Sequence, residues 1–510
     1  MLRKLETVAV AVAVAVAMGM TSAGSAAATP ASLGSAGLST AIVTSDQAAL
    51  RAAPRDSAQQ QAQLWQGELL EVRGERLDYL QVYDHRRERG GFVRASQVRR
   101  TSLATTEAPE LLAVLRFVQD RSGTEALGIG FAAAYLKAAP VESVNGQEGI
   151  AAFDALGTMA DRLARRASSG ALLTKPQEAA LSAHLDVARQ YGVGFASYER
   201  DGRMTICYDG EAFRRVLAML SNPEQRARAA LALTRTECVD PNLQPLQRAR
   251  VDQWRAEVLE RVDAGKLPGW LRNRVHMRLA SVYSTVAYQR TRQGEPAVDA
   301  AQKALAELAG VSKSELTDVD LPAYSDAAMR VNASRWAAMP AVVAAKPGSK
   351  GPSIVTVAGQ PGETCVLLVD SKRDDKHPLA HRCTYSIVWA NSASLNREGT
   401  ALALAVQPLE AWRELWLFRK DSRGAWDVSV LPPATTNPDL GYAEFAGWVP
   451  GGKQVLVARE ARGEGKYRKN FEVLKLASLT ADRQAPEAGM LGAFIRWQDA
   501  GWKGGSVSLR

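Results

Sequence analysis

The spacing of apolar residues changes twice along this 510-residue chain, and this change limits the folds open to it. Between Ala41 and Arg100, apolar and polar residues alternate in short runs separated by glycine or charged turns, which is typical of a small closed β-sheet. Over residues 107–339 the period becomes that of a helix, and beyond residue 353 short β-type runs return. We therefore predict a multidomain α+β protein with a small β-barrel (41–100), an irregular α-helical middle domain (107–339) and a C-terminal antiparallel β domain (353–510).

The first 28 residues have the parts of a secretory signal peptide. A positively charged start is followed by an apolar run from Val8 to Met20 and by the cleavage sequence Ala26-Ala27-Ala28. The run is short for a membrane span, and no later stretch approaches the roughly 20 apolar residues that a spanning helix needs. We predict that residues 1–28 are removed, that residues 29–40 form a linker, and that the protein is periplasmic or secreted without a membrane span.

Export changes the interpretation of the four cysteines. In an oxidising compartment an even number of cysteines suggests disulfides. Of the three possible pairings we prefer Cys207–Cys238 and Cys365–Cys383, because each pair then lies within one predicted domain. Four free, buried thiols are the alternative. Neither pair has the spacing of a zinc site.

The net charge of +9 favours anionic partners such as cell-wall polymers or lipid headgroups. The basic residues are spread along the chain and do not form blocks, so nucleic acid is not predicted as a partner.

The motifs between Ala41 and Arg100 resemble a bacterial SH3 domain. They are an L-R-x-x-P opening, a Gly-led strand, an aromatic-x-x-Val strand and a Gly-aromatic-Val hairpin end, at Leu50–Pro54, Gly67–Val72, Tyr79–Val82 and Gly90–Val93. The resemblance implies a docking module and places Tyr79 and Tyr83 nearest a ligand groove. Tyr79 stands where this family usually has tryptophan. The alternative is that both tyrosines only cover one end of the barrel.

Prolines and glycines divide the helical region. Helices are predicted to begin near three prolines, Pro223, Pro245 and Pro268. The pair of segments 271–292 and 297–309 has the length of a tetratricopeptide hairpin, but no second copy follows at a fixed period. Alternating residues around Asp201-Gly202 predict a β-hairpin over residues 195–208, which brings Cys207 within reach of Cys238.

After a predicted linker (340–352), three turn-plus-strand segments resemble one another. They cover residues 362–369, 398–405 and 451–458, and their predicted partner strands are 385–389, 415–418 and 471–476. The third segment resembles the turn of bacterial WD-repeat-like propeller blades. Three copies are fewer than the four or so blades of a closed propeller, so we predict an antiparallel β domain with blade-like hairpins.

Motifs that would carry chemistry are weak. There is no G-x-S-x-G sequence, and residues 128–133 match G-x-G-x-x-A only loosely, within helix-like sequence. His377 and His381 lie beside two aspartates, but Pro378 disfavours the helix that would bring the two rings together. His184 is interpreted as a surface or core-edge residue. The tryptophans of the C-terminal region can stack on sugars, although core packing explains most of them. We therefore predict no catalytic residue, metal or cofactor.

The prediction for function is a non-catalytic protein of the cell envelope that docks on peptidoglycan or an envelope protein through its SH3-like domain. The sequence does not indicate an oligomeric state. The competing hypothesis is an envelope hydrolase acting on peptidoglycan, with an unrecognised active site in the helical domain. A deep cleft in residues 107–339, lined by converging carboxylates or histidines, would favour the hydrolase.

Overall fold

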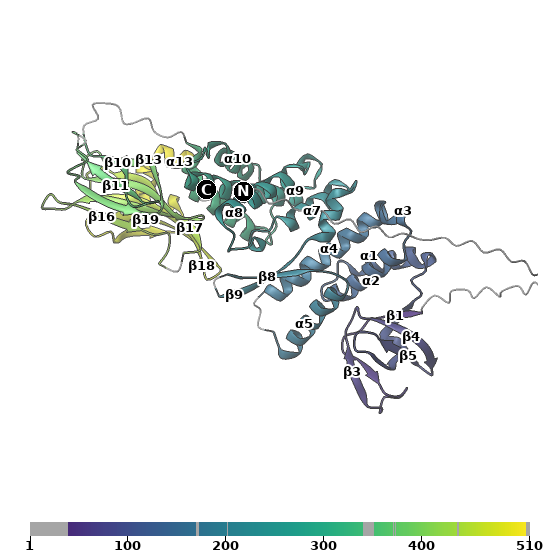
Figure 1. The fold of residues 1–510 in the computed structure, drawn as a ribbon. Coiled ribbons are helices and arrows are strands. Elements are labelled where there is room, and N and C mark those ends of the chain that lie inside the picture. Colours follow the sequence, from purple (N-terminus) through teal and green to yellow (C-terminus); the bar gives the residue numbers. More distant parts are fainter. Residues whose placement is uncertain are drawn as a thin grey trace, which may run out of the picture.

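A computed structural model describes residues 39–169, 173–200, 202–339, 351–370, 372, 374–435 and 438–505. The predicted signal peptide and most of the two predicted linkers (29–40 and 340–352) lie outside these residues. The described chain combines helices with largely antiparallel sheets, which confirms the α+β class. Figure 1 shows the order in space: a small N-terminal sheet, a helical region and a large C-terminal group of strands.

The N-terminal sheet has seven strands in the order β3-β2-β6-β5-β4-β1-β7. Its strands are β1 (Thr40–Val43), β2 (Ala48–Arg51), β3 (Gln60–Leu64), β4 (Leu69–Arg76), β5 (Tyr79–Asp84), β6 (Arg89–Arg94) and β7 (Val98–Thr101). Leu70, Leu80 and Val82 belong to its apolar core. The edge strands β3 and β7 do not pair, so the closed barrel expected from the alternation is not observed. Most of β3 is exposed polar sequence, which offers no apolar face for closure.

The helical region divides into two cores, one formed mainly by α1–α5 and one by α7–α11. Its helices are α1 (Ala108–Val118), α2 (Glu125–Ala138), α3 (Val141–Val144), α4 (Gln147–Ser168), α5 (Lys175–Gln190), α6 (Glu211–Ala218), α7 (Pro223–Leu233), α8 (Pro245–Glu260), α9 (Gly269–Gln293), α10 (Val298–Ala309) and α11 (Leu321–Ser334), followed by the 3-10 turn η6 (Arg335–Ala338). The prolines mark the starts of α7, α8 and α9 as predicted, because a proline in the first turn loses no helical hydrogen bond.

The predicted hairpin is present as β8 (Phe195–Arg200) and β9 (Arg203–Tyr208). Cys207 on β9 is bonded to Cys238, with 5.7 Å between their Cα atoms. This confirms the preferred pairing. The bond joins the hairpin, which packs on α4, to the 3-10 turn η3 (Thr236–Cys238) that precedes α8.

The G-x-G-x-x-A sequence lies inside α2 and packs against other elements. A Cβ atom on Gly128 would overlap the sulfur of Met159 on α4. A Cβ atom on Gly130 would lie 2.8 Å from the carbonyl oxygen of Gly67 in the N-terminal sheet. Gly128 therefore leaves room for the flexible side chain of Met159, and Gly130 lets the backbone of the N-terminal region approach the helix.

The C-terminal strands form a three-stranded sheet and two consecutive four-stranded meanders. The three-stranded sheet contains β10 (Ser353–Ala358), β11 (Thr364–Val369) and β12 (Ala380–Thr384). The first meander contains β13 (Ile387–Leu395), β14 (Ala401–Leu409), β15 (Trp412–Lys420) and β16 (Trp426–Leu431). The second contains β17 (Leu440–Val449), β18 (Gln454–Gly463), β19 (Lys466–Lys475) and β20 (Ala481–Ala485). Two short helices follow, α12 (Gly492–Trp497) and α13 (Ala500–Gly505).

Two details of this region differ from the prediction. The meanders are joined by a short parallel pairing, in which Trp412 and Arg413 of β15 lie opposite Gly441 and Tyr442 of β17. The first repeated segment pairs with β12, not with residues 385–389, because those residues mostly belong to β13 and pair with β14. The other two predicted hairpins are observed as β14–β15 and β18–β19.

The second predicted disulfide is also confirmed. Cys365 and Cys383 are bonded directly across β11 and β12, with their Cα atoms 3.8 Å apart. This is closer than the expected separation of about 5.5 Å. In the described part of the chain, no helix is both long and apolar enough to cross a membrane.

Candidate functional site

The two tyrosines predicted to lie near a groove have different surroundings. Tyr79 is 2 % exposed, and its hydroxyl donates a hydrogen bond to Asp56 at 2.6 Å. This bond is the main reason that the pKa of Tyr79 is raised. Arg94 also pairs with Asp56 and lies over the Tyr79 ring. Tyr79 is therefore enclosed by its own sheet, and its ring face is not available for stacking.

Tyr83 belongs to an accessible group of side chains that we call the Tyr83 cluster: Glu71, Arg73, Tyr83 and His85. The guanidinium carbon of Arg73 lies 3.9 Å from the centre of the Tyr83 ring, and the His85 ring meets the Tyr83 ring edge-on at 4.9 Å between centroids. Glu71 accepts a hydrogen bond from Arg73 at 3.0 Å and lies 2.6 Å from His85 Nε2. The hydrogen bond with Arg73 is the main cause of the lowered pKa of Glu71, and the contact with His85 lowers it further.

A β-bulge lies next to this cluster. The register of β4 and β5 shifts between Val72 and Gly74, so Arg73 has no partner residue on β5. A bulge adds one residue to a strand and turns its side chain away from the regular alternation. Tyr83 lies opposite Glu71, beside the extra residue. The side chains of Arg73 and His85 are 47 % and 69 % exposed, so a ligand can reach the Tyr83 cluster from solvent.

His184 connects the N-terminal sheet to α5. Its Nε2 lies 2.8 Å from the carboxylate of Asp46 and 3.4 Å from the side-chain amide of Gln66. The His184 side chain is only 4 % exposed, so this residue is buried at the contact. Its partners stand more than a hundred positions earlier in the chain, and no local pattern pointed to them. Two further histidines pair with carboxylates: His276 on α9 with Glu307 on α10, and His377 with Asp374 three residues before it.

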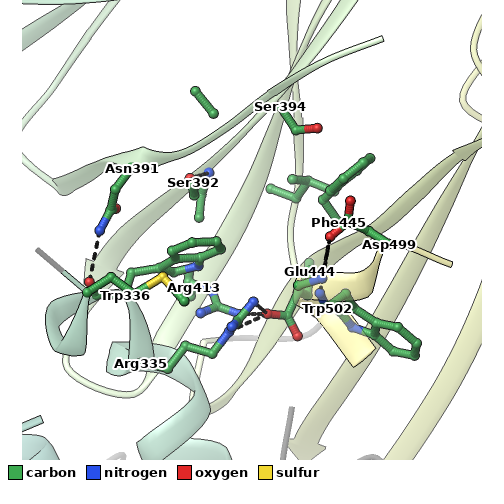
Figure 2. A pocket seen from close by; sticks show the side chains of 16 residues that line it. Arg335, Trp336, Asn391, Ser392, Ser394, Arg413, Glu444, Phe445, Asp499 and Trp502 are labelled. Carbon is green, nitrogen blue, oxygen red and sulfur yellow. Dashed lines mark hydrogen bonds and ion pairs between the residues drawn. The ribbon is translucent and has the colours of Figure 1, made fainter. Parts of the chain in front are cut away.

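A second candidate site is a cavity of about 340 Å³ where the helical region meets the C-terminal strands (Figure 2). We call it the arginine cavity. Its polar and aromatic lining includes Arg335, Trp336, Asn391, Arg413, Glu444 and Trp502. Arg335 and Trp336 come from η6, Asn391 from β13, Arg413 from β15, Glu444 from β17 and Trp502 from α13.

Two guanidinium groups share one carboxylate in the arginine cavity. Arg335 Nε donates to Glu444 Oε1 at 2.6 Å, and Arg413 Nη2 lies 3.2 Å from the same oxygen. All three side chains are at most 4 % exposed. Burial lowers the pKa of Arg413 to about 10, although the negative charge of Glu444 raises it in part. Arg413 therefore stays charged at neutral pH. The lining also holds the carboxylate of Asp499, so its two arginines and two carboxylates balance.

Sequence reasoning did not identify the arginine cavity. Core packing was expected to explain most of the C-terminal tryptophans, and Trp502 is 7 % exposed. The only available signal was a charged residue, Arg413, in the strand sequence W-R-E-L-W. A buried arginine needs a partner, but that partner, Glu444, lies on a different strand and could not be identified from spacing.

The cleft that the hydrolase hypothesis requires would be lined by converging carboxylates or histidines. A second cavity, of about 470 Å³, opens where α1 and α2 meet the N-terminal sheet, and Glu110 is the only carboxylate in its lining. Glu110 pairs with Arg99. Among the described residues, the group with metal-ligand geometry is Glu363, Cys365 and Cys383, but its two cysteines are bonded to each other and cannot act as thiolate ligands.

No protein-family model, curated protein or solved structure matches this chain. The function proposed below therefore rests on the geometry of the sites and on the sequence.

Proposed function

We propose that this chain is an exported, non-catalytic binding protein of the cell envelope that docks on peptidoglycan through the Tyr83 cluster. The observation that carries the proposal is the exposed outer surface of β4 and β5, where Tyr83 lies between the guanidinium group of Arg73 and the ring of His85. The proposed export, with a mature chain beginning near Thr29, is supported by the two disulfides, which form in oxidising compartments.

The chemistry of peptidoglycan matches these side chains. Its sugar rings can stack on a tyrosine ring, and the free carboxylates of its peptides can pair with guanidinium and imidazolium groups. Arg73 is held by an exposed ion pair with Glu71, and exposed pairs contribute only about 0–1 kcal/mol. Arg73 can therefore exchange Glu71 for a ligand carboxylate at little cost. The resemblance of residues 41–100 to bacterial SH3 domains supports the same docking role.

The test is sedimentation of the full chain, without residues 1–28, with purified peptidoglycan sacculi. We expect Tyr83→Ala and Arg73→Ala each to weaken binding at least fivefold, and soluble muropeptides to compete. Tyr385→Ala is the matched control, because Tyr385 is 59 % exposed and lies outside the N-terminal sheet. Tyr79→Ala is not a suitable variant, because it removes a buried ring.

If Tyr83→Ala sediments like the unchanged protein, the Tyr83 cluster is not the docking site. If the unchanged protein does not sediment with sacculi, peptidoglycan is not its ligand. The proposal would then be wrong, and the competing partner, an envelope protein, would take its place.

A further inference from the structure

We propose that Cys365 and Cys383 form a reducible disulfide, and that its reduction by a dithiol opens a zinc site made of both cysteines and Glu363. This function is separate from docking through the Tyr83 cluster. The first argument is the accessibility of the disulfide. Cys383 is exposed on β12, at the end of the strand order β10-β11-β12, and Cys365 is partly exposed. Exposed disulfides are the ones that thiols reduce readily.

The sheet turns this disulfide away from the C-terminal core. Val366 and Leu368 of β11 are fully buried against the first meander. Side chains alternate across a strand, so Cys365 lies on the opposite face of β11, directly across from Cys383 on β12. In the other disulfide, Cys207 is only 3 % exposed, where the hairpin packs on α4. We therefore expect a reductant in solution to reach the disulfide of Cys365 first.

The reduction is a thiol–disulfide exchange. A thiolate of the dithiol attacks the exposed sulfur of Cys383, the bond between the two protein sulfurs breaks, and Cys365 leaves as a thiolate that takes up a proton. The second thiol of the reductant then attacks the mixed disulfide and releases Cys383. Two electrons and two protons pass to the protein, and the reductant is oxidised to a disulfide.

The released thiols stand beside a carboxylate. One carboxylate oxygen of Glu363 and the two cysteine sulfurs lie within 4.8 Å of one another. The backbone N–H of Gln360 holds this carboxylate by donating to Glu363 Oε2 at 3.0 Å. Gly359 keeps the space beside them open, because a Cβ atom there would lie 2.5 Å from Glu363 Oε2 and 3.1 Å from Cys365 Sγ. Three ligand atoms are therefore gathered in one place.

Two thiolates and a carboxylate favour zinc over magnesium and calcium, which prefer oxygen ligands alone. Zinc takes four ligands, so three from the protein leave one position for water. The ion displaces the two thiol protons when it binds. Because the bonded cysteines offer no thiolate, the disulfide excludes zinc and its reduction admits it.

The test reduces the full chain, without residues 1–28, with dithiothreitol and then labels free thiols with iodoacetamide, with peptide mass spectrometry as the readout. We expect Cys365 and Cys383 to be labelled at least tenfold faster than Cys207 and Cys238. Zinc chloride, added after anaerobic removal of the reductant, should slow this labelling at least tenfold, and magnesium chloride should not. Resistance to dithiothreitol, equal or earlier reduction of the other disulfide, labelling unchanged by zinc, or equal protection by magnesium would each overturn the proposal.

One variant connects zinc to the predicted carboxylate. Glu363→Gln keeps the shape of the side chain but removes its charge, and we expect it to weaken zinc binding at least tenfold while the rate of reduction stays unchanged. Glu487→Gln is the matched control, because Glu487 is exposed and does not belong to the three-ligand group. Unchanged zinc binding in Glu363→Gln would refute the site. Because reduction and zinc protection are measured first on the unchanged protein, the proposal stays testable if the variant does not fold.

Discussion

The helical region is joined to a β-structure at each end, and the two junctions differ in chemistry. At the N-terminal junction the backbones of Gly67 and Gly130 touch, and the hydroxyl of Tyr191 donates to the Gly67 carbonyl at 2.5 Å. At the C-terminal junction, charged side chains cross from one part to the other. The first junction depends on small residues and shape, and the second depends on charges that compensate one another away from water.

Glu410 shows how the C-terminal junction works. It lies in the turn between β14 and β15 and accepts hydrogen bonds from Thr285 at 2.5 Å, Arg330 at 3.2 Å and Arg248 at 3.3 Å. Burial alone would raise the pKa of Glu410, but the two guanidinium groups outweigh it and lower the pKa. A second link, from Arg462 on β18 to Asp326 on α11, spans 2.6 Å. The C-terminal strands are therefore tied to α8 and α11 by ion pairs and to α9 by a hydrogen bond.

The largest expected effect comes from breaking the charge balance at the C-terminal junction. Glu444→Gln keeps the shape of the side chain but leaves Arg335 and Arg413 buried without their shared carboxylate. Removing one partner of a buried ion pair typically costs about 3–5 kcal/mol. We expect a loss of this size in the free energy of unfolding, measured by urea titration.

The control for that measurement is Glu487→Gln, because Glu487 is exposed and surface substitutions usually change stability by less than about 0.5 kcal/mol. A loss below about 1 kcal/mol for Glu444→Gln would mean that water compensates the arginines. The C-terminal junction would then not depend on buried charge.

A smaller effect is expected at the N-terminal junction from Gly130→Ala. The added methyl group would meet the backbone of Gly67, so the sheet must move away from α2. Overpacking of this kind typically costs about 1–3 kcal/mol, and the higher helix propensity of alanine returns up to about 1 kcal/mol. We expect a net destabilisation, with faster amide hydrogen exchange in β1 and β4.

Gly128→Ala, on the same helix, is the matched variant. Its methyl group would meet the flexible side chain of Met159 inside the helical core. We expect it to leave hydrogen exchange in β1 and β4 unchanged. If both variants affect these strands equally, the contact between Gly67 and Gly130 does not hold the junction.

These comparisons show which parts of the molecule the sequence could predict. Local signals were sufficient for the helix starts at prolines, for the hairpin ending in Tyr208, and for both disulfides, whose cysteines lie 31 and 18 residues apart. Each of these features depends on residues that are close in the sequence: a turn, a helix-breaking residue or two cysteines a short distance apart. The α+β class followed in the same way from the change of hydrophobic period.

The junctions and the sites could not be predicted because their partners are distant in sequence. Gly130 was considered as part of a loose G-x-G-x-x-A match, but its role depends on Gly67, which lies in the N-terminal region. The position of Arg73 over Tyr83 depends on the register in which β4 pairs with β5. The open edge of the N-terminal sheet and the parallel contact of β15 with β17 likewise depend on tertiary packing.

The smallest expected effect comes from Asp46, which pairs with His184 at the N-terminal junction. Burial alone would raise the pKa of Asp46, but its bonds with His184 and Gln66 outweigh burial and lower it. A carboxylate with a lowered folded pKa contributes stability above its unfolded pKa of about 3.9. That contribution is lost as the pH falls through the folded value. The Asp46 side chain is 34 % exposed, so the contribution should be at most about 1 kcal/mol.

We therefore expect Asp46→Asn to be slightly less stable than the unchanged protein at pH 7, with the difference in urea midpoint shrinking towards zero near pH 3. Asp186→Asn is the control on α5, because the Asp186 side chain is 45 % exposed and pairs only with its neighbour Arg189. A difference for Asp46→Asn that is absent at pH 7, or that persists at pH 3, would show that the charge of Asp46 does not stabilise this junction. The N-terminal junction would then depend on shape alone, and the contrast with the charged C-terminal junction would be complete.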